Sequence, residues 1–269
     1  MARVIRKENN LLKLYEEYKN KAKKLFIAGG ILIVSSYVSF PLFFLTFGLS
    51  AFLTMLLFTS GGVCVLLGAY NLNKANTYKS GLEGEATSDG VLSNLPDDYY
   101  IFYSIDIKYQ GEKSQIDHLV VGPTGVFIIE SRNVKGYILG RDDDKEITVH
   151  KVGQKGGQYT VKMYNPIKQV TTHVYRASSY LKEQGINTWV QGIVYFTNPA
   201  STVCLESSKI PVFSESEDGG REIYNYILNY ENNNPLDENK IKLIVKAIEE
   251  NLNQNNGFQY NNSYATNFD

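Results

Sequence analysis

Two acidic residues, Asp117 and Glu130, lie in short apolar runs on either side of a turn from Gly122 to Gly125. Opposed residues of an antiparallel hairpin have position numbers with a constant sum, so pairing Val121 with Val126 sets Asp117 opposite Glu130. Their Cβ atoms would lie about 4.5 to 5.5 Å apart, where two ionised carboxylates repel. A hard cation such as Mg²⁺ takes oxygen ligands and would relieve that repulsion. The hairpin therefore predicts a Mg²⁺ or Mn²⁺ site on these two carboxylates.

The neighbouring polar residues extend this site. Strand alternation places Glu130 and Arg132 on one face, and the same register sets Gln115 opposite Arg132. The alternative is a wet sheet edge at which Arg132 simply neutralises the acidic pair. Apolar neighbours such as Ile128 favour the cation site. His118 points to the opposite face and is expected to be a packed histidine rather than a ligand.

The elements that must position these residues belong to a mixed α/β domain. A helix over 81–95 ends before Pro96, and a β-rich strand over 99–109 forms an antiparallel meander with the hairpin strands at 115–121 and 126–132. Asn165-Pro166 supplies a cap and a first-turn proline for a helix that stops at Gly185. The remaining predicted elements are strands at 136–139, 146–152, 158–163, 189–196 and 209–213, and helices at 220–229 and 236–252.

The N-terminal part has a different composition. No Asp, Glu, Lys or Arg occurs in the 49 residues from Leu25 to Asn73. That length fits two membrane-spanning helices, at about 25–45 and 49–70, with a turn near Pro41. A cleaved signal peptide is the alternative, but its apolar region would be far shorter. Basic residues flank both ends of the run, so the positive-inside rule predicts that both termini and the soluble domain are cytoplasmic.

Cysteine and histidine usage excludes other classes of site. The only cysteines, Cys64 and Cys204, fall in different parts of the chain, which rules out a disulfide scaffold or a cysteine zinc site. The three histidines are too widely separated in sequence to indicate a metal site built from imidazole ligands.

At these residues the sequence resembles the nuclease-related domain (NERD) family, whose fold is similar to that of the PD-(D/E)xK restriction-endonuclease-like phosphodiesterases. The resemblance covers roughly 81–195. The motifs that carry it are Gly84-Glu85, Gln115-Ile116-Asp117-His118, the Gly122-Pro123-Thr124-Gly125-Val126 turn, Glu130-Ser131-Arg132-Asn133, Lys135-Gly136, and Asn165-Pro166 followed by Gln169 and His173. It implies a restriction-endonuclease-like mixed sheet flanked by helices.

The resemblance also implies roles for single residues. Asp117 and Glu130 would hold the metal, Glu85 would approach as a third catalytic carboxylate, and Gln169 would touch substrate or position a ligand. The family usually has Lys where this sequence has Arg132. A guanidinium keeps its proton, whereas an ammonium can release one near a metal, so Arg132 would clamp the scissile phosphate instead.

Charge distribution supports a polyanionic partner near this site. The region from Gly81 onward has a net charge of −8, yet Ser131 to Lys182 holds ten basic and four acidic residues. We therefore expect Gln115, Lys135, Gln169, His173 and Arg176 to bind nucleic acid, DNA rather than RNA. The alternative is a catalytically degenerate module that holds nucleic acid or a protein partner at the membrane. No feature of the sequence sets an oligomeric state.

The expected organisation has five parts. A basic juxtamembrane helix (1–24) and two transmembrane helices (25–73) precede the nuclease-related domain (80–200). A C-terminal strand and helices (201–252) and a disordered tail (253–269) follow.

Overall fold

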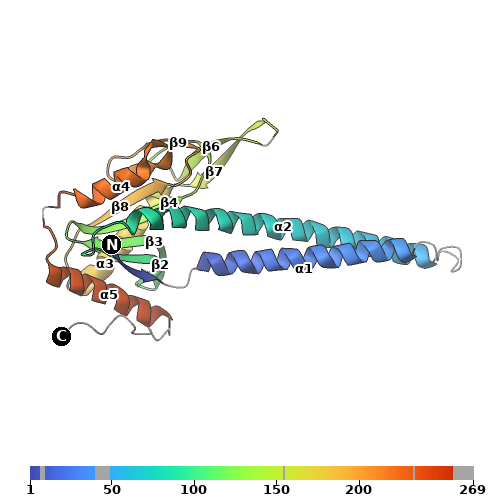
Figure 1. The fold of residues 1–269 in the computed structure, drawn as a ribbon, viewed down its shortest axis with the longest axis horizontal. Coiled ribbons are helices and arrows are strands. Elements are labelled where there is room, and N and C mark those ends of the chain that lie inside the picture. The colour runs from blue at the N-terminus through green and yellow to red at the C-terminus, as the bar shows by residue number, and fades with distance from the viewer. Residues whose placement is uncertain (7–9, 40–48, 154, 233, 257–269) are drawn as a thin grey trace. The chain divides into compact units, whose positions relative to one another are not determined.

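The computed structural model describes residues 1–6, 10–39, 49–153, 155–232 and 234–256 (Figure 1). The chain divides into two compact units. One unit comprises Asn9–Leu82. The other comprises Met1–Glu8 together with Glu83–Asp269 and contains every strand that the structure describes.

The smaller unit is built from two long helices, α1 (Asn10–Ser39) and the larger part of α2 (Leu49–Leu92). Both are long and apolar enough to cross a membrane. The two helices pack closely where they carry glycine. A Cβ added at Gly29 would lie only 2.9 Å from the carbonyl oxygen of Gly61, which leaves no room for a larger residue. Large apolar side chains such as Val34 and Phe52 are exposed, as lipid-facing positions would be.

The helix boundaries differ from those predicted. The basic segment and the first apolar segment form the single helix α1, while Arg3–Arg6 form a strand, β1, rather than the start of a juxtamembrane helix. The second apolar segment and the helix expected over 81–95 are one continuous helix, α2, since no proline interrupts it before Pro96. The turn expected near Pro41 lies outside the described residues.

The larger sheet has six strands in the order β1-β2-β3-β4-β8-β10. The predicted meander is confirmed: β2 pairs antiparallel with β3, and β3 with β4. β8 joins β4 in parallel, and β10 joins β8 in parallel. The bounds are β2 (Tyr100–Tyr109), β3 (Glu112–Gly122), β4 (Gly125–Arg132), β8 (Val190–Phe196) and β10 (Val212–Ser214).

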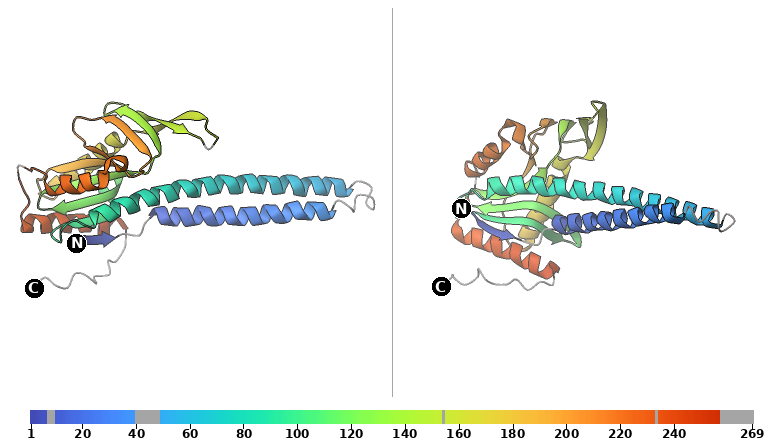
Figure 2. Two further views of the ribbon diagram at one scale, coloured as in Figure 1. Left: turned by 45° about the horizontal axis from the view of Figure 1, so that its top comes forward. Right: turned by 45° about the vertical axis from the view of Figure 1, so that its right-hand side comes forward.

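Helices cover both faces of this sheet. Leu119 and Ile128 point into the core formed with α3 (Pro166–Glu183) and α5 (Glu238–Asn256). Val120 and Phe127 point the other way, toward α4 (Gly219–Leu228) and the last turn of α2. Figures 1 and 2 show α4 and α5 on opposite sides of the sheet. Strand alternation thus separates two buried layers.

A second sheet has four strands in the order β7-β6-β5-β9. They are β5 (Gly136–Arg141), β6 (Glu146–Val152), β7 (Gln158–Tyr164) and β9 (Ser201–Glu206). The sequence predicted three of these strands but missed β9, which pairs in parallel with β5 across a long sequence separation. The disordered tail was predicted to start at 253, but α5 continues to Asn256; the rest of that tail lies outside the described residues.

Candidate active site

The two acidic residues of the hairpin lie just beyond its paired region. The β3–β4 ladder runs from Gly122↔Gly125 to His118↔Ile129, which confirms the predicted register, and Asp117 and Glu130 occupy the next opposed positions. Both belong to the sheet face covered by α3. Glu130 is fully buried, and the Asp117 side chain is 16% exposed. The fold therefore places one inaccessible and one partly accessible carboxyl group together.

The backbone around Asp117 departs from regular pairing on its other side as well. The β2–β3 ladder passes from Tyr103↔His118 to Ile105↔Ile116, so Ser104 and Asp117 are not bridged. Ser104 has a φ of +49°, which marks a local irregularity of the strand. Asp117 Oδ2 instead accepts a hydrogen bond of 3.0 Å from the backbone N–H of Ser131. The end of β4 thereby fixes the orientation of this carboxyl group.

The surroundings of Asp117 disfavour its ionised form. Burial raises the pKa of Asp117 well above its usual range, and the negative charges of Glu130 and Glu85 raise it further. Arg132 and the Ser131 N–H act in the opposite direction without cancelling these effects. A cation at this position would favour ionisation and remove the conflict.

Glu130 has basic neighbours but lacks well-oriented hydrogen-bond donors. Arg132 Nη2 lies 2.5 Å from Oε1, and His173 Nε2 lies 3.3 Å from Oε2. Within the part of the chain that the structure describes, neither oxygen receives a hydrogen bond of good geometry, and neither ring nitrogen of His173 has one. Glu130 is therefore held by the charge of Arg132, while its hydrogen-bonding capacity is not met.

Helix α3 brings Gln169 and His173 to this site. The Asn165 side chain caps the helix by accepting from the N–H of Ile167 at 3.0 Å. Gln169 and His173 are four residues apart, so they share a helix face. Gln169 Oε1 accepts a hydrogen bond from Arg132 Nη2 at 2.5 Å. Two of the five residues that the sequence assigned to substrate contact thus lie beside the Arg132–Glu130 pair.

The end of α2 contributes Glu85. A Cβ at Gly84 would lie 2.9 Å from the Cβ of Asn133, so glycine is required for this close approach of the helix to the end of β4. Glu85 is buried, and its charge acts on Asp117. Even so, no group of three His, Cys, Asp or Glu side chains among the described residues is placed to hold a metal ion. Any cation would rely mainly on two carboxylates.

His118 belongs to a separate polar cluster on the other side of the sheet. Its Nε2 lies 2.7 Å from Asp89 Oδ1, and its Nδ1 lies 3.4 Å from Ser131 Oγ. The Ser131 hydroxyl is also 2.7 Å from that of Ser88. The prediction of a packed histidine is confirmed, since His118 is fully buried. The sequence reasoning missed Ser88, Asp89 and Ser131. Ser88 and Asp89 follow Gly84-Glu85 closely in the sequence and Ser131 follows Glu130, so their positions were a usable signal.

Three predicted substrate contacts lie elsewhere. Arg176 donates to Ser114 Oγ at 2.9 Å and to Glu112 Oε2 at 3.1 Å, so it ties α3 to the start of β3. Lys135 is exposed in the link between β4 and β5. Gln115 is exposed on β3 and pairs with a residue of β2, while the guanidinium of Arg132 turns toward α3. The observed site is therefore more compact than the predicted one.

Comparisons with known proteins assign part of the chain to a family. The family model of the nuclease-related domain, NERD, matches residues 80–197, so this part of the chain is a nuclease-related domain. An uncharacterized protein of Bacillus anthracis is 30% identical over 125 residues, which are 45% of this chain and 56% of the relative. The chain thus spans little more than half the length of that relative. No solved structure matches the chain.

Proposed function

We propose that the protein is a metal-dependent phosphodiesterase that cleaves nucleic acid, DNA rather than RNA. The observation that carries this proposal is Glu130, a fully buried carboxylate whose two oxygens lack hydrogen bonds of good geometry beside a second carboxyl group. Two close acidic groups, one of which lacks hydrogen bonds of good geometry, fit a divalent cation. Mg²⁺ commonly takes one or two protein carboxylates and completes its shell with water and phosphate oxygens.

Asp117 and Glu130 would hold Mg²⁺ or Mn²⁺, with Glu85 nearby as a third carboxylate. The metal would activate water and neutralise charge on the phosphate. In hydrolysis the water oxygen bonds to phosphorus, the opposite P–O ester bond breaks, and one proton moves from water to the leaving oxygen. Arg132 cannot accept that proton. Glu85 and the His173 ring are the groups of this chain that we assign to proton transfer.

Arg132 and Gln169 would bind the substrate. The guanidinium is already oriented by Gln169 at 2.5 Å and can clamp a phosphate with two parallel hydrogen bonds. Moving Arg132 from Glu130 to a phosphate would also free a carboxylate oxygen for the metal. The family match and the described sheet support a restriction-endonuclease-like fold for this domain.

We further propose that α1 and α2 anchor the domain in the cell membrane as a multi-pass protein. Their length and apolar character support this, and the basic residues that flank the apolar run support a cytoplasmic location of both termini and the domain. The substrate would then be nucleic acid on the cytoplasmic side.

The second candidate is a non-catalytic module that holds nucleic acid or a protein partner at the membrane. It is favoured by Arg132, which contacts Glu130 in the place where a cation would act and which replaces the usual lysine. In this reading the arginine is a permanent substitute for the metal.

The test uses the full chain purified in detergent micelles and incubated with DNA or RNA and Mg²⁺ or Mn²⁺. We expect cleavage that is lost in Asp117→Asn and Glu130→Gln, with heat of Mg²⁺ binding that disappears in the same variants. Arg132→Lys should keep or increase cleavage. If wild type and Arg132→Lys both leave every substrate intact, the catalytic proposal is wrong and the binding module remains.

A further inference from the structure

The second sheet has one buried face and one open face. Ile138 and Val149 are almost completely buried and belong to the same core as Val170 of α3. Their strand neighbours Tyr137 and His150 are exposed. The same alternation continues on β9, whereas β7, at the edge of the sheet, is exposed on both faces. We define the open face by its exposed side chains Tyr137, His150, Thr160, Lys162, Thr202 and Cys204.

Two aromatic rings form the centre of the open face. Strand pairing sets Thr160, His150, Tyr137 and Thr202 in one row across the four strands. The rings of Tyr137 and His150 have centroids 6.4 Å apart and are inclined by only 33°, and Thr160 Oγ1 lies 3.1 Å from His150 Nδ1. Tyr137 is 44% exposed. The row therefore presents two neighbouring rings, tilted by 33° to each other, to solvent.

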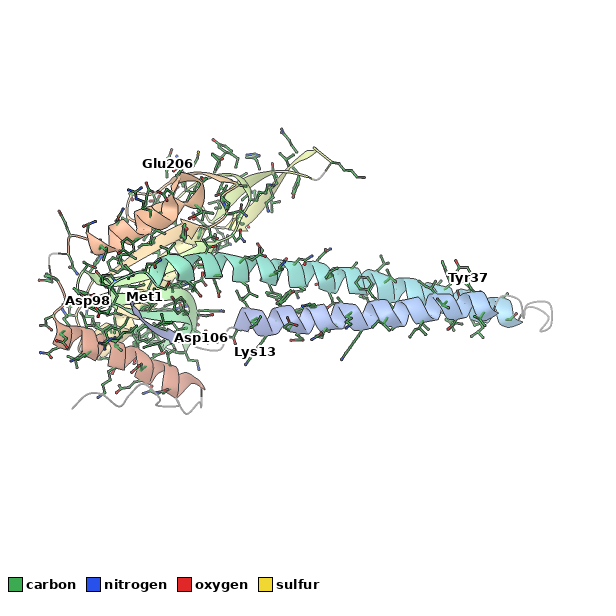
Figure 3. All side chains as sticks on the ribbon, in the orientation of Figure 1. Met1, Lys13, Tyr37, Asp98, Asp106 and Glu206 are labelled. Carbon is green, nitrogen blue, oxygen red and sulfur yellow. The ribbon has the colours of Figure 1, made fainter. Side chains whose placement is uncertain are left out.

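The hairpin of β6 and β7, residues 145–164 and here termed the arm, is basic. It contains four lysines and a single acidic residue, Glu146, although the chain from Gly81 onward carries a net charge of −8. Lys155 and Lys162 are exposed. Glu146 and Glu206 are exposed on the same face, but they lie four residues along their strands from His150 and Thr202, so both carboxylates are away from the Tyr137–Thr202 row (Figure 3 labels Glu206). The ring-bearing part of the face is left with positive charge.

We propose that the open face and the arm bind single-stranded nucleic acid. This proposal rests on the proposed function and names the form of substrate. Exposed rings stack on unpaired bases, and lysines beside them contact the phosphates. A duplex fits less well, because its bases are already stacked. Four strands also span about 14 Å between the outer strands, more than the roughly 12 Å width of the major groove.

The open face is connected to the candidate active site at both ends. β5 begins at Gly136, shortly after Arg132 ends β4, and β7 ends directly before α3, which carries Gln169. Asn165 Nδ2 donates to the backbone oxygens of Arg141 and Asp144, which fixes the start of α3 to the second sheet. A nucleic-acid strand bound on the open face would thus be held by strands that connect directly to β4 and α3, which position the site.

The test measures the fluorescence anisotropy of 5′-fluorescein-labelled dT20 with the full chain in detergent micelles and EDTA, so that binding is separated from cleavage. Tyr137→Ala should weaken binding by about 5-fold or more through lost stacking. Lys155→Glu with Lys162→Glu should lower the salt dependence of log K by about 1.4. Tyr175→Ala removes a tyrosine that is 62% exposed and Lys246→Glu reverses a charge on α5, so both serve as controls.

Equal weakening by the control variants, unchanged binding in the arm variants, or no binding of dT20 by the wild type would each overturn the proposal. So would tighter binding of a matched 20-base-pair duplex than of dT20. Cleavage is measured separately with Mg²⁺. Arm-dependent dT20 binding without any cleavage would support this inference and refute the proposed catalysis. Cleavage combined with arm-independent binding would do the reverse.

Discussion

Replacing Arg132 by Met removes the guanidinium next to Glu130 while retaining much of the apolar stem. Removing one partner of a buried ion pair costs about 3–5 kcal/mol, because the other charge stays buried. Arg132 is 24% exposed whereas Glu130 is 1% exposed, so the lower end, about 3 kcal/mol, applies. For a unit of this size the midpoint of thermal unfolding should fall by roughly 6–12 °C in EDTA.

Trp189, the single tryptophan of the chain, belongs to the same unit as the site and can report its unfolding by fluorescence in micelles. The matched control is Arg176→Met. Arg176 is 21% exposed, but its partner Glu112 is 74% exposed, so its loss should cost about 1–2 kcal/mol including its hydrogen bonds. Mg²⁺ at a hundred times its Kd should raise the free energy of unfolding of Arg132→Met by about 2.7 kcal/mol. The increase for wild type should be smaller. Equal midpoints for wild type and Arg132→Met in EDTA, or no response to Mg²⁺, would refute the reasoning.

Three further outcomes are expected. Gly84→Ala should destabilise the protein by about 1–3 kcal/mol, because its Cβ meets the end of β4, whereas Gly90→Ala, in open space on the same helix, should be neutral or gain up to about 1 kcal/mol in chemical denaturation. In EDTA, wild type should lose stability relative to Asp117→Asn as pH rises from 3.8 through the raised pKa of Asp117, because the native state retains a proton that the unfolded state releases; parallel pH profiles would contradict this. Gly29→Val should lower the unfolding midpoint of the α1–α2 pair in circular dichroism melts. Gly30→Val should not, because an added Cβ at Gly30 has no neighbour within 4 Å.

The hairpin and α3 could be predicted because their signals are local. A four-residue turn fixes the register of β3 and β4, and Asn165-Pro166 marks the start of α3. The same logic fails where distant segments meet. β1 is only four residues long and pairs in parallel with β2 almost a hundred positions away, and β9 joins β5 in the same manner. Neither pairing leaves a short-range pattern.

The site was predicted only in part for a related reason. Period-two alternation identified the face that holds Asp117 and Glu130, but it cannot specify the rotamer of a long side chain. Arg132 therefore appeared opposite Gln115, whereas its guanidinium contacts Gln169 on another element. The continuity of α2 was missed: a span over 49–70 and a separate helix over 81–95 were predicted, although glycines and polar residues between them do not end a helix as a proline would.

The ion pair between Arg132 and Glu130 has a consequence for how such a domain evolves. Because the chain supplies its own positive charge at the buried acid, it can fold and persist where divalent metal is scarce. Selection for a stable structure is then uncoupled from selection for chemistry. A lineage could lose turnover and still keep the scaffold intact for another task.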